Sequence, residues 1–145
     1  MRIEKPGFQL INSDVEQVFQ KLTSTDKELF DYFKNYLEKE YEGDLSQRLI
    51  YYDIARIGDY IKNKLTSNQT NSFESFFNTI EEILKMDDSN VNNLIVIGLF
   101  ESLQNHTDAN PTYSYFNRWL GPKSKKEWDS LIGFWSGKKE KNYED

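Results

Sequence analysis

The sequence predicts an all-α protein, and three observations lead to this prediction. Along most of the 145 residues, apolar side chains recur at spacings of three and four, the periodicity of a helix with one buried face. No segment shows the strict alternation that is typical of a half-buried strand. The run 94–100 is apolar at every position, and a helix of that kind must be covered on all sides. We therefore expect one compact domain of six or seven mostly antiparallel helices around a central apolar helix at about Ser89–Gln104.

The central run could also be a buried strand, because periodicity alone does not separate short apolar runs into helix and strand. Its flanks favour a helix, since Ser89 or Asn90 can cap it and the apolar positions continue in helical stripes to Leu103. The run is well short of the roughly 20 apolar residues that cross a bilayer. We expect it to form the centre of the core.

Two helices are expected near the start of the chain. The first begins at Ser13 or Asp14, and Thr25 is expected to cap the second, with Glu28 at the capping-box spacing. Gly43 is suited to end this second helix in the left-handed conformation. The apolar stripes expected to be buried are Val15, Val18, Phe19 and Leu22 on the first helix, and Phe30, Phe33, Leu37 and Tyr41 on the second.

The third region, 45–65, is predicted to break near Tyr52 and Asp53, with Asp53 capping the second piece. Gly58 lies inside that piece, where glycine costs about 1 kcal/mol relative to alanine. A glycine at such a position suggests a close helix crossing. The polar stretch 66–71 reads as a loop.

The second half begins with the clearest amphipathic helix, which is expected to form an antiparallel hairpin with the central helix through Asp87 and Asp88. Its apolar face is Phe73, Phe76, Phe77, Ile80, Ile83 and Leu84, and its polar face is Glu74, Asn78, Glu81, Glu82 and Lys85. A short helix is expected from Pro111 to Gly121, and Pro122 starts the last one. The residues expected to face inward on these are Tyr113, Phe116, Trp119, Leu120, Trp128, Leu131, Ile132 and Trp135.

The domain is expected to cover residues 1–137, followed by a mobile charged tail at 138–145, which has no apolar period. The chain contains no cysteine, which fits a reducing compartment, and its N-terminus lacks the apolar core of a signal peptide. We therefore predict a cytoplasmic protein without a membrane partner.

The charge is acidic and unevenly distributed. The net charge is −6, and two segments are each net −4: 26–44, with seven acids and three lysines, and 74–88, with five acids and one lysine. Such a surface disfavours phosphate backbones and favours a basic protein partner. We therefore expect no nucleic-acid binding, although a simply solvated acidic face is an equally good interpretation of this charge.

No catalytic, cofactor or metal signature is found in the sequence. The seven glycines do not have the spacing of a phosphate-binding loop, and the calcium-loop pattern starting at Asp88 has Asn93 in place of glycine and Leu99 in place of glutamate. His106 is the only histidine. We therefore predict no catalytic residues, cofactor or metal and no enzymatic activity.

The candidate partner-binding residues form two groups. The first is a tyrosine-containing acidic patch, a composition that is favoured at the centres of protein interfaces. It comprises Glu42, Asp44, Tyr51, Tyr52 and Asp53, and the second group is Glu74, Glu81 and Asp87. The alternative for Asp53 and Gly43 is a structural role at helix ends. The region Tyr113–Trp119, with Arg118, is the only one that joins aromatic residues to positive charge, and its tryptophan fits a core position better than a site.

Three segments resemble an uncharacterised bacterial family of small all-helical proteins that occur among toxin-immunity systems. They are Tyr41-Glu42-Gly43-Asp44-Leu45, the central run from Asn93 to Leu103, and Trp119-Leu120-Gly121-Pro122-Lys123-Ser124-Lys125-Lys126-Glu127-Trp128. The resemblance covers roughly residues 26–135 and implies a protein that neutralises a toxin domain by binding it. It supplies no catalytic motif. Ser46-Gln47-Arg48 departs from the more apolar, proline-containing turn expected there.

These observations predict a non-enzymatic immunity protein that occludes the basic active-site surface of a bacterial toxin with an acidic, tyrosine-containing face. The main alternative is a helical-repeat adaptor, because the hairpin 73–103 has the form of a solenoid unit, although no period recurs along the chain. A small helical enzyme that uses carboxylates is the second alternative. A deep pocket with two acids of raised pKa would support it.

Overall fold

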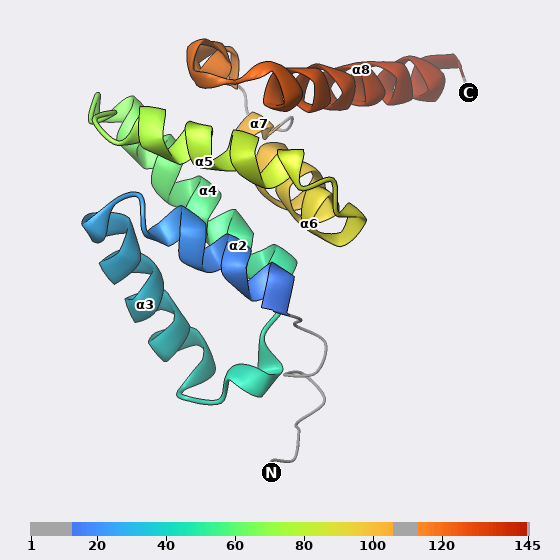
Figure 1. The fold of residues 1–145 in the computed structure, drawn as a ribbon. Helices are drawn as coiled ribbons and strands as arrows, with labels where there is room; N and C mark the ends of the chain where they lie inside the picture. Colours follow the sequence, from blue (N-terminus) through green and yellow to red (C-terminus); the bar gives the residue numbers. More distant parts are fainter. Residues whose placement is uncertain (1–12, 106–112, 145) are drawn as a thin grey trace.

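The computed structural model describes residues 13–105 and 113–144, with side chains from 14 to 105 and from 113 to 135. Over this part of the chain every regular element is a helix, and the helices pack around one hydrophobic core (Figure 1). The predicted all-α domain with a central apolar helix is therefore confirmed. The elements are α2 Ser13–Thr23, α3 Lys27–Tyr41, η1 Leu45–Gln47, α4 Ile50–Thr66, α5 Phe73–Lys85, α6 Ser89–Asn93, η2 Leu94–Phe100, α7 Glu101–Gln104, η3 Tyr113–Trp119 and α8 Pro122–Glu144.

The elements α6, η2 and α7 follow one another without a break and form the predicted central helix Ser89–Gln104. Asp88 caps it by accepting a 3.1 Å hydrogen bond from the backbone N–H of Val91. The middle stretch, η2, is a π-helix, in which backbone hydrogen bonds span five residues instead of the four of an α-helix. The N–H of Glu101 donates to the carbonyl of Val96, the five-residue spacing of that geometry.

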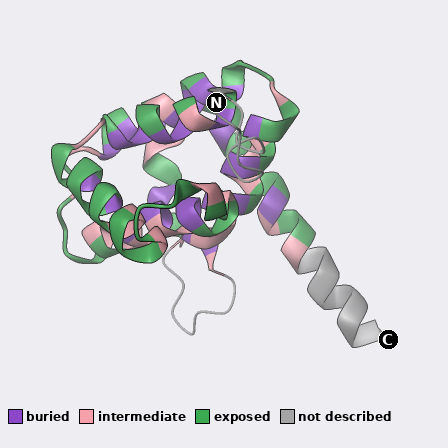
Figure 2. Ribbon diagram, turned by 90° about the horizontal axis from the view of Figure 1, so that it is seen from below, coloured by how far each residue is buried: buried purple, intermediate pink, exposed green. Residues whose placement is uncertain are grey.

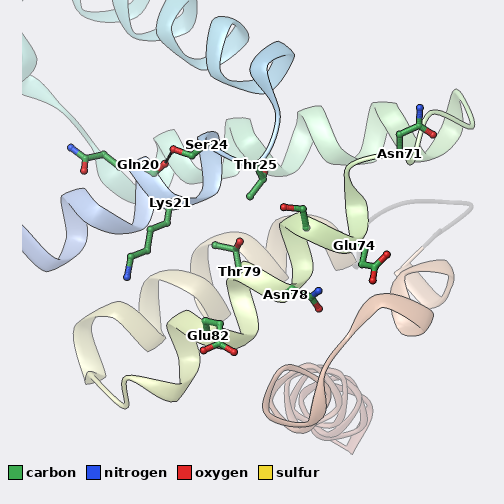
Figure 3. Close-up of a pocket in the computed structure, with 10 residues that line it drawn as sticks. Gln20, Lys21, Ser24, Thr25, Asn71, Glu74, Asn78, Thr79 and Glu82 are labelled. Atoms are coloured by element: carbon green, nitrogen blue, oxygen red, sulfur yellow. Dashed lines mark hydrogen bonds between the residues drawn. The ribbon is translucent and has the colours of Figure 1, made fainter.

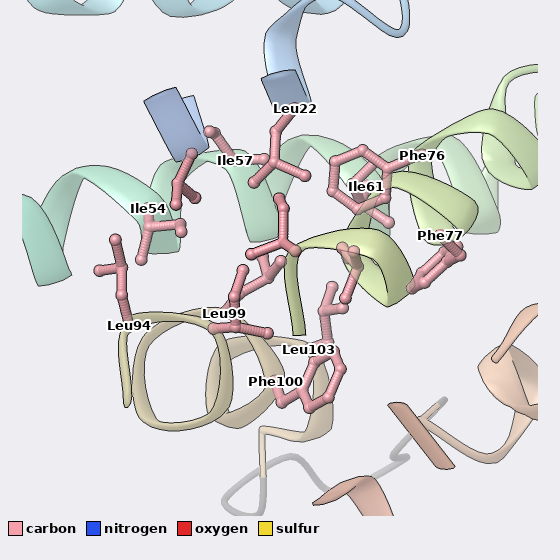
Figure 4. Close-up of a cluster of buried hydrophobic side chains, with 14 of the residues drawn as sticks. Leu22, Ile54, Ile57, Ile61, Phe76, Phe77, Leu94, Leu99, Phe100 and Leu103 are labelled. Carbon is pink, nitrogen blue, oxygen red and sulfur yellow. The ribbon is translucent and has the colours of Figure 1, made fainter. Parts of the chain in front are cut away.

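The core forms where the central helix crosses α4 and is closed by α2 and α5 (Figure 4). Buried side chains point toward one another from these helices, and Figure 2 shows that the buried faces are turned inward around the molecule. Those labelled in Figure 4 are Leu22, Ile54, Ile57, Ile61, Phe76, Phe77, Leu94, Leu99, Phe100 and Leu103. The whole predicted apolar face of α5 is buried, so that prediction is confirmed.

Two glycines allow the close approach of α4 and the central helix. A Cβ atom at Gly98 would lie 2.6 Å from Cγ2 of Ile54, and one at Gly58 would lie 2.5 Å from Oγ of Ser102. The close crossing predicted from Gly58 is therefore confirmed. At Gly98 the backbone of the central helix likewise lies against the start of α4.

Several predictions of helix caps, buried positions and helix bounds are wrong by one or a few residues. Asp26, not Thr25, caps α3, because its carboxylate accepts from the N–H of Glu28 while Thr25 bonds to the carbonyl of Leu22. The buried stripe of α3 includes Leu29 instead of Phe30, which is 48% exposed. The helix α4 also runs unbroken from Ile50, so the predicted kink does not occur.

The C-terminal tail, 138–145, was predicted to be mobile and separate from the domain. Helix α8 extends to Glu144, so 138–144 is helical, and the mobility predicted for 138–145 remains a prediction. Pro111, predicted to start the helix before Gly121, lies outside the described residues. Over the described part, none of the helices combines the length and the apolar composition needed to cross a bilayer.

Candidate functional site: a tyrosine groove beside a buried carboxylate

Asp53 is fully buried in the first turn of α4. Its Oδ1 accepts hydrogen bonds from the hydroxyls of Tyr36, at 2.7 Å, and Tyr41, at 2.6 Å, and its Oδ2 accepts from Nε of Arg48, at 2.9 Å. The prediction that Asp53 caps a second helix and belongs to an exposed patch is therefore wrong. A fully buried carboxylate with three donors holds helices together and does not reach a partner.

Arg48 joins this carboxylate to the first helix of the described chain. Its side chain is 3% exposed, its Nη1 lies 3.2 Å from Oε1 of Glu16 in α2, and its guanidinium is centred 4.6 Å above the ring of Phe19. Burial raises the pKa of the Tyr36 and Tyr41 hydroxyls, and so does their hydrogen bonding to Asp53, so both remain donors at neutral pH. The segment that leads into α4 is therefore held by contacts to both α2 and α3.

Because Asp53 points into the protein, apolar and aromatic side chains near it in the sequence point toward solvent. Tyr51 and Tyr52 are 44% and 48% exposed, and Leu45 and Leu49, just before them, are exposed as well. Sequence reasoning placed the two tyrosines at the surface but missed the leucines. The signal was available: the run 49–52 is apolar throughout, and four consecutive helical residues point in directions too varied for one core face.

The tyrosines line a surface groove with the central helix. This groove, called the tyrosine groove below, has a volume of about 510 Å³. Its lining residues are Tyr51, Tyr52, Ala55, Lys62, Ile97, Gly98, Glu101, Ser102 and Asn105. Ile97 is 47% exposed, so the expectation that the central helix is covered on all sides is wrong at this position. A run apolar at all seven positions contains more apolar surface than its neighbours cover here.

The structure of the groove explains why Ile97 stands open. Gly98, the next residue, is pressed against the start of α4, where a Cβ atom would lie 3.4 Å from Cδ2 of Tyr51 as well as against Ile54. The π-helical turn widens the helix at this crossing. Such turns occur often at functional sites. The result is an exposed isoleucine that lines the same groove as two half-exposed tyrosines.

The acidic members of the first predicted group lie in the turn that leads to this surface. Glu42 and Asp44 are both exposed, Glu42 in the left-handed conformation with φ 50°, followed by Gly43 with φ 89°, as predicted for that glycine. The Asp44 carboxylate accepts from the N–H and the hydroxyl of Ser46, at 3.1 and 2.6 Å, and so caps η1. Glu42 and Asp44 thus lie in the connection between α3 and α4, and Tyr51 and Tyr52 lie in the first turn of α4.

The three residues of the second predicted group lie in three different surroundings. Glu74 is exposed and lines another hollow, and Asp87 is exposed in the turn between α5 and α6, with φ 57°. Glu81 is buried against the N-terminus of α8, so its predicted place on the polar face is wrong. Its carboxylate accepts from the N–H groups of Lys123 and Ser124, both at 2.9 Å, and from the Ser124 hydroxyl at 2.8 Å.

The hydrogen bonds to Glu81 also favour the ionised form of its carboxyl group. Burial by itself would raise the pKa of this carboxyl, but the hydrogen bonds from Lys123 and Ser124 lower it overall. Gly121 makes room for the contact, because a Cβ atom there would lie 2.6 Å from the carboxylate. Glu81 is therefore the N-terminal cap of α8, supplied from another helix.

A hollow larger than the tyrosine groove lies between α2 and α5, with a volume of about 990 Å³ (Figure 3). Its lining is polar and contains no aromatic side chain: Gln20, Lys21, Ser24, Thr25, Asn71, Glu74, Ser75, Asn78, Thr79 and Glu82. Glu74 and Glu82 come from α5 and Lys21 from α2. An open, wholly polar groove offers no desolvated anchor for a protein partner.

Among the described residues, no three His, Cys, Asp or Glu side chains are grouped so that they could hold a metal ion. His106 lies outside those residues. The lining of the tyrosine groove combines the aromatic and apolar side chains of Tyr51, Tyr52 and Ile97 with one acid, Glu101, and one base, Lys62.

Residues 19–136 match a protein family described as a domain of unknown function, DUF7674, and the chain belongs to that family. No curated protein and no solved structure matches the chain.

Proposed function

We propose that this protein is a non-enzymatic binding protein, and that the tyrosine groove is where it contacts its protein partner. The single observation that carries this proposal is the exposure of Tyr51, Tyr52 and Ile97 around one groove. Tyrosine is enriched among the residues that contribute most to binding energy, and such residues cluster in pockets that a partner can dehydrate. In this groove each of the three has roughly half its surface still to bury.

The groove lining itself carries one acid, Glu101, and one base, Lys62, so the charge that supports a basic partner comes from the end of α3, the connection that follows it and the chain as a whole. Glu42 and Asp44 are exposed in the turn before the tyrosines, Glu38 and Glu40 are exposed at the end of α3, and the chain carries a net charge of −6. Complementary charge steers two proteins together and sets their orientation, while the apolar centre supplies most of the affinity. A cationic cleft is the surface that this arrangement fits.

The proposed biological role is that of an immunity protein, which neutralises a bacterial toxin by covering its basic active-site surface. This role rests on the resemblance of three sequence segments to small helical proteins of toxin-immunity systems, and the groove adds a place for the contact. Neutralisation would be by occlusion: the acidic turn approaches the cationic cleft, and Tyr51 and Tyr52 become buried against its wall.

The adaptor alternative receives less support from the fold. A solenoid adaptor would stack similar hairpins into a regular concave array. In the described residues the helices instead surround one core, with α4 crossing the central helix at Gly58 and Gly98. The enzyme alternative would be supported by paired acids in a pocket. The two carboxylates that are buried among the described side chains, Asp53 and Glu81, bond instead to different helices.

The test pairs this protein with the product of its neighbouring gene, if that gene encodes a secreted toxin. The toxin domain is expressed with and without this protein, and growth is followed. The purified pair is then titrated by calorimetry at two salt concentrations. We expect restored growth, and an affinity that falls at high salt because complementary charges are screened.

Variants locate the contact. Tyr52→Ala and Ile97→Ser should each weaken binding at least about tenfold, the loss typical of a central interface residue. Glu42→Lys with Asp44→Lys should reduce both the affinity and its salt dependence. Phe30→Ala is the matched control, because Phe30 is equally exposed but lies on α3. A toxin that is neutralised equally well by all these variants would exclude the tyrosine groove, and an unprotected cell would exclude the immunity role.

A further inference from the structure

A third hollow lies at the other end of α4, and Arg118 is the one charged residue among the described ones that line it. It is formed by the connection between α4 and α5 and by η3, and its volume is about 510 Å³. Its lining residues are Leu65, Asn68, Thr70, Ser114, Tyr115, Asn117, Arg118 and Trp119. No carboxylate is among them, although the chain has 24 acidic residues against 18 basic ones.

The base of this hollow is held rigidly by the core. Trp119 packs edge-on against Phe73, with ring centroids 4.9 Å apart, and lies nearly parallel to Phe77 at 6.3 Å. Both phenylalanines are buried. Trp119, which was predicted to face the core, therefore packs against the core with one side of its ring system and lines the hollow with the other side.

Arg118 lies over this tryptophan. Its guanidinium carbon is 4.4 Å from the centroid of the Trp119 ring, and it makes no ion pair with any described residue. Stacking restrains a guanidinium while leaving the N–H groups at its edge free for a phosphate or carboxylate. An arginine held in this way beside a hollow without acids is suited to bind an anion.

The rest of the lining offers a flat surface and neutral hydrogen-bonding groups. Tyr115 is 64% exposed, so its ring is available for stacking. The hydroxyls of Thr70 and Ser114 and the amide of Asn68 make no side-chain hydrogen bond within the described residues, and Asn117 donates to the carbonyl of Ser114 at 3.1 Å. Aromatic and hydroxyl groups around one cation suit a ligand that is planar at one end and anionic at the other.

We infer that this hollow binds a small ligand in which a flat ring carries a phosphate or a carboxylate, with the anionic group on Arg118 and the ring against Tyr115. The inference does not depend on the proposed function. It uses a different set of residues, so either can fail without the other.

Amide chemical shifts of the whole protein, followed by NMR during titration, test this inference. The probes are AMP for a phosphate ligand and phenylacetate for a carboxylate ligand. Adenosine and inorganic phosphate are the half-ligands. We expect at least one of the two full probes to shift the amides of residues 65–70 and 114–119, and AMP, if it is the ligand, to bind at least about tenfold more tightly than either half-ligand.

Two exposed-residue variants make the test specific. Arg118→Gln removes the cation and Tyr115→Ala the ring, and each should weaken binding of the full probe at least about tenfold. Lys34→Gln and Phe30→Ala, on α3, are the matched controls for charge and for aromatic surface, and far-UV circular dichroism checks that all four variants fold. The inference is overturned if neither full probe binds, if phosphate alone binds as tightly as AMP, or if Arg118→Gln binds like the wild type.

Discussion

The hydroxyl of Tyr41 donates a 2.6 Å hydrogen bond to Oδ1 of Asp53 and accepts a 3.0 Å bond from the backbone N–H of Leu49. One side chain near the end of α3 therefore satisfies a buried carboxylate and also caps a free N–H at the start of α4. Leu49, the N-cap residue, has no side chain that could do this itself. These two hydrogen bonds tie the end of α3 to the residue before α4. They therefore determine where α4 begins and where Tyr51 and Tyr52 reach the surface.

Replacing Tyr41 with phenylalanine should destabilise the fold. The Tyr41→Phe variant removes a donor to a buried charge and an acceptor for a backbone N–H, and a hydrogen bond to a charged group contributes about 1.5–3 kcal/mol. We expect a loss of that size in the free energy of unfolding, measured with urea. The control is Tyr51→Phe, whose side chain is half exposed, and it should change stability by less than about 0.5 kcal/mol. Equal stabilities of the two variants would contradict this role.

Arg48 and Asp53 should behave as one unit. Asp53→Leu leaves the buried Arg48 guanidinium with only the partly exposed Glu16 as a partner, and breaking a buried pair costs about 3–5 kcal/mol. The double variant Arg48→Met, Asp53→Leu should lose much less than the sum of the two single changes, because no charge is left buried alone. Urea unfolding of the single and double variants closes this double-mutant cycle. Additive losses would mean that the two side chains stabilise the fold independently.

The cap that Glu81 provides to α8 should depend on pH. Because the folded protein lowers the pKa of Glu81 below its ordinary value of 4.5, the stabilisation is complete above about pH 4.5 and is lost as pH falls through the lower, folded-state value. Glu81→Gln should cost about 1–3 kcal/mol at pH 7, since an amide cannot accept all three hydrogen bonds. The stability difference from wild type should shrink below pH 4.5. A difference that is constant from pH 7 to pH 3 would contradict this account.

The sequence was informative wherever one helix face met the core. The bounds of the central helix and the buried face of α5 follow from apolar periodicity, because each depends on a few adjacent turns. The burial of Asp53 could not be predicted in this way. Its three partners come from α3 and from the connection before α4, and a polar side chain at a helix start is ordinarily a cap. Only the assembled fold shows that Tyr36, Tyr41 and Arg48 converge on it.

The candidate site was predictable in composition but not in extent. Tyr51 and Tyr52 were placed correctly at the surface, whereas Ile97 was assigned to the core because its six neighbours in the run are apolar too. What separates it from them is the close contact of Gly98 with α4, which decides how the helix is turned. Local pattern cannot specify that rotation, because it is a property of two helices packed together.

The contact at Gly98 gives a final prediction that isolates packing from helix propensity. Alanine at a helix interior is favoured over glycine by about 0.5–1 kcal/mol when nothing obstructs it. Gly133→Ala meets no atom within 4 Å and should stabilise the protein by that amount. Gly98→Ala introduces a Cβ atom 2.6 Å from Cγ2 of the fully buried Ile54, and overpacking of this kind costs about 1–3 kcal/mol. We therefore expect opposite signs for the two substitutions in thermal unfolding. If Gly98→Ala were as stabilising as Gly133→Ala, the central helix and α4 would not be in close contact, and the tyrosine groove beside them would not have the shape on which partner binding depends.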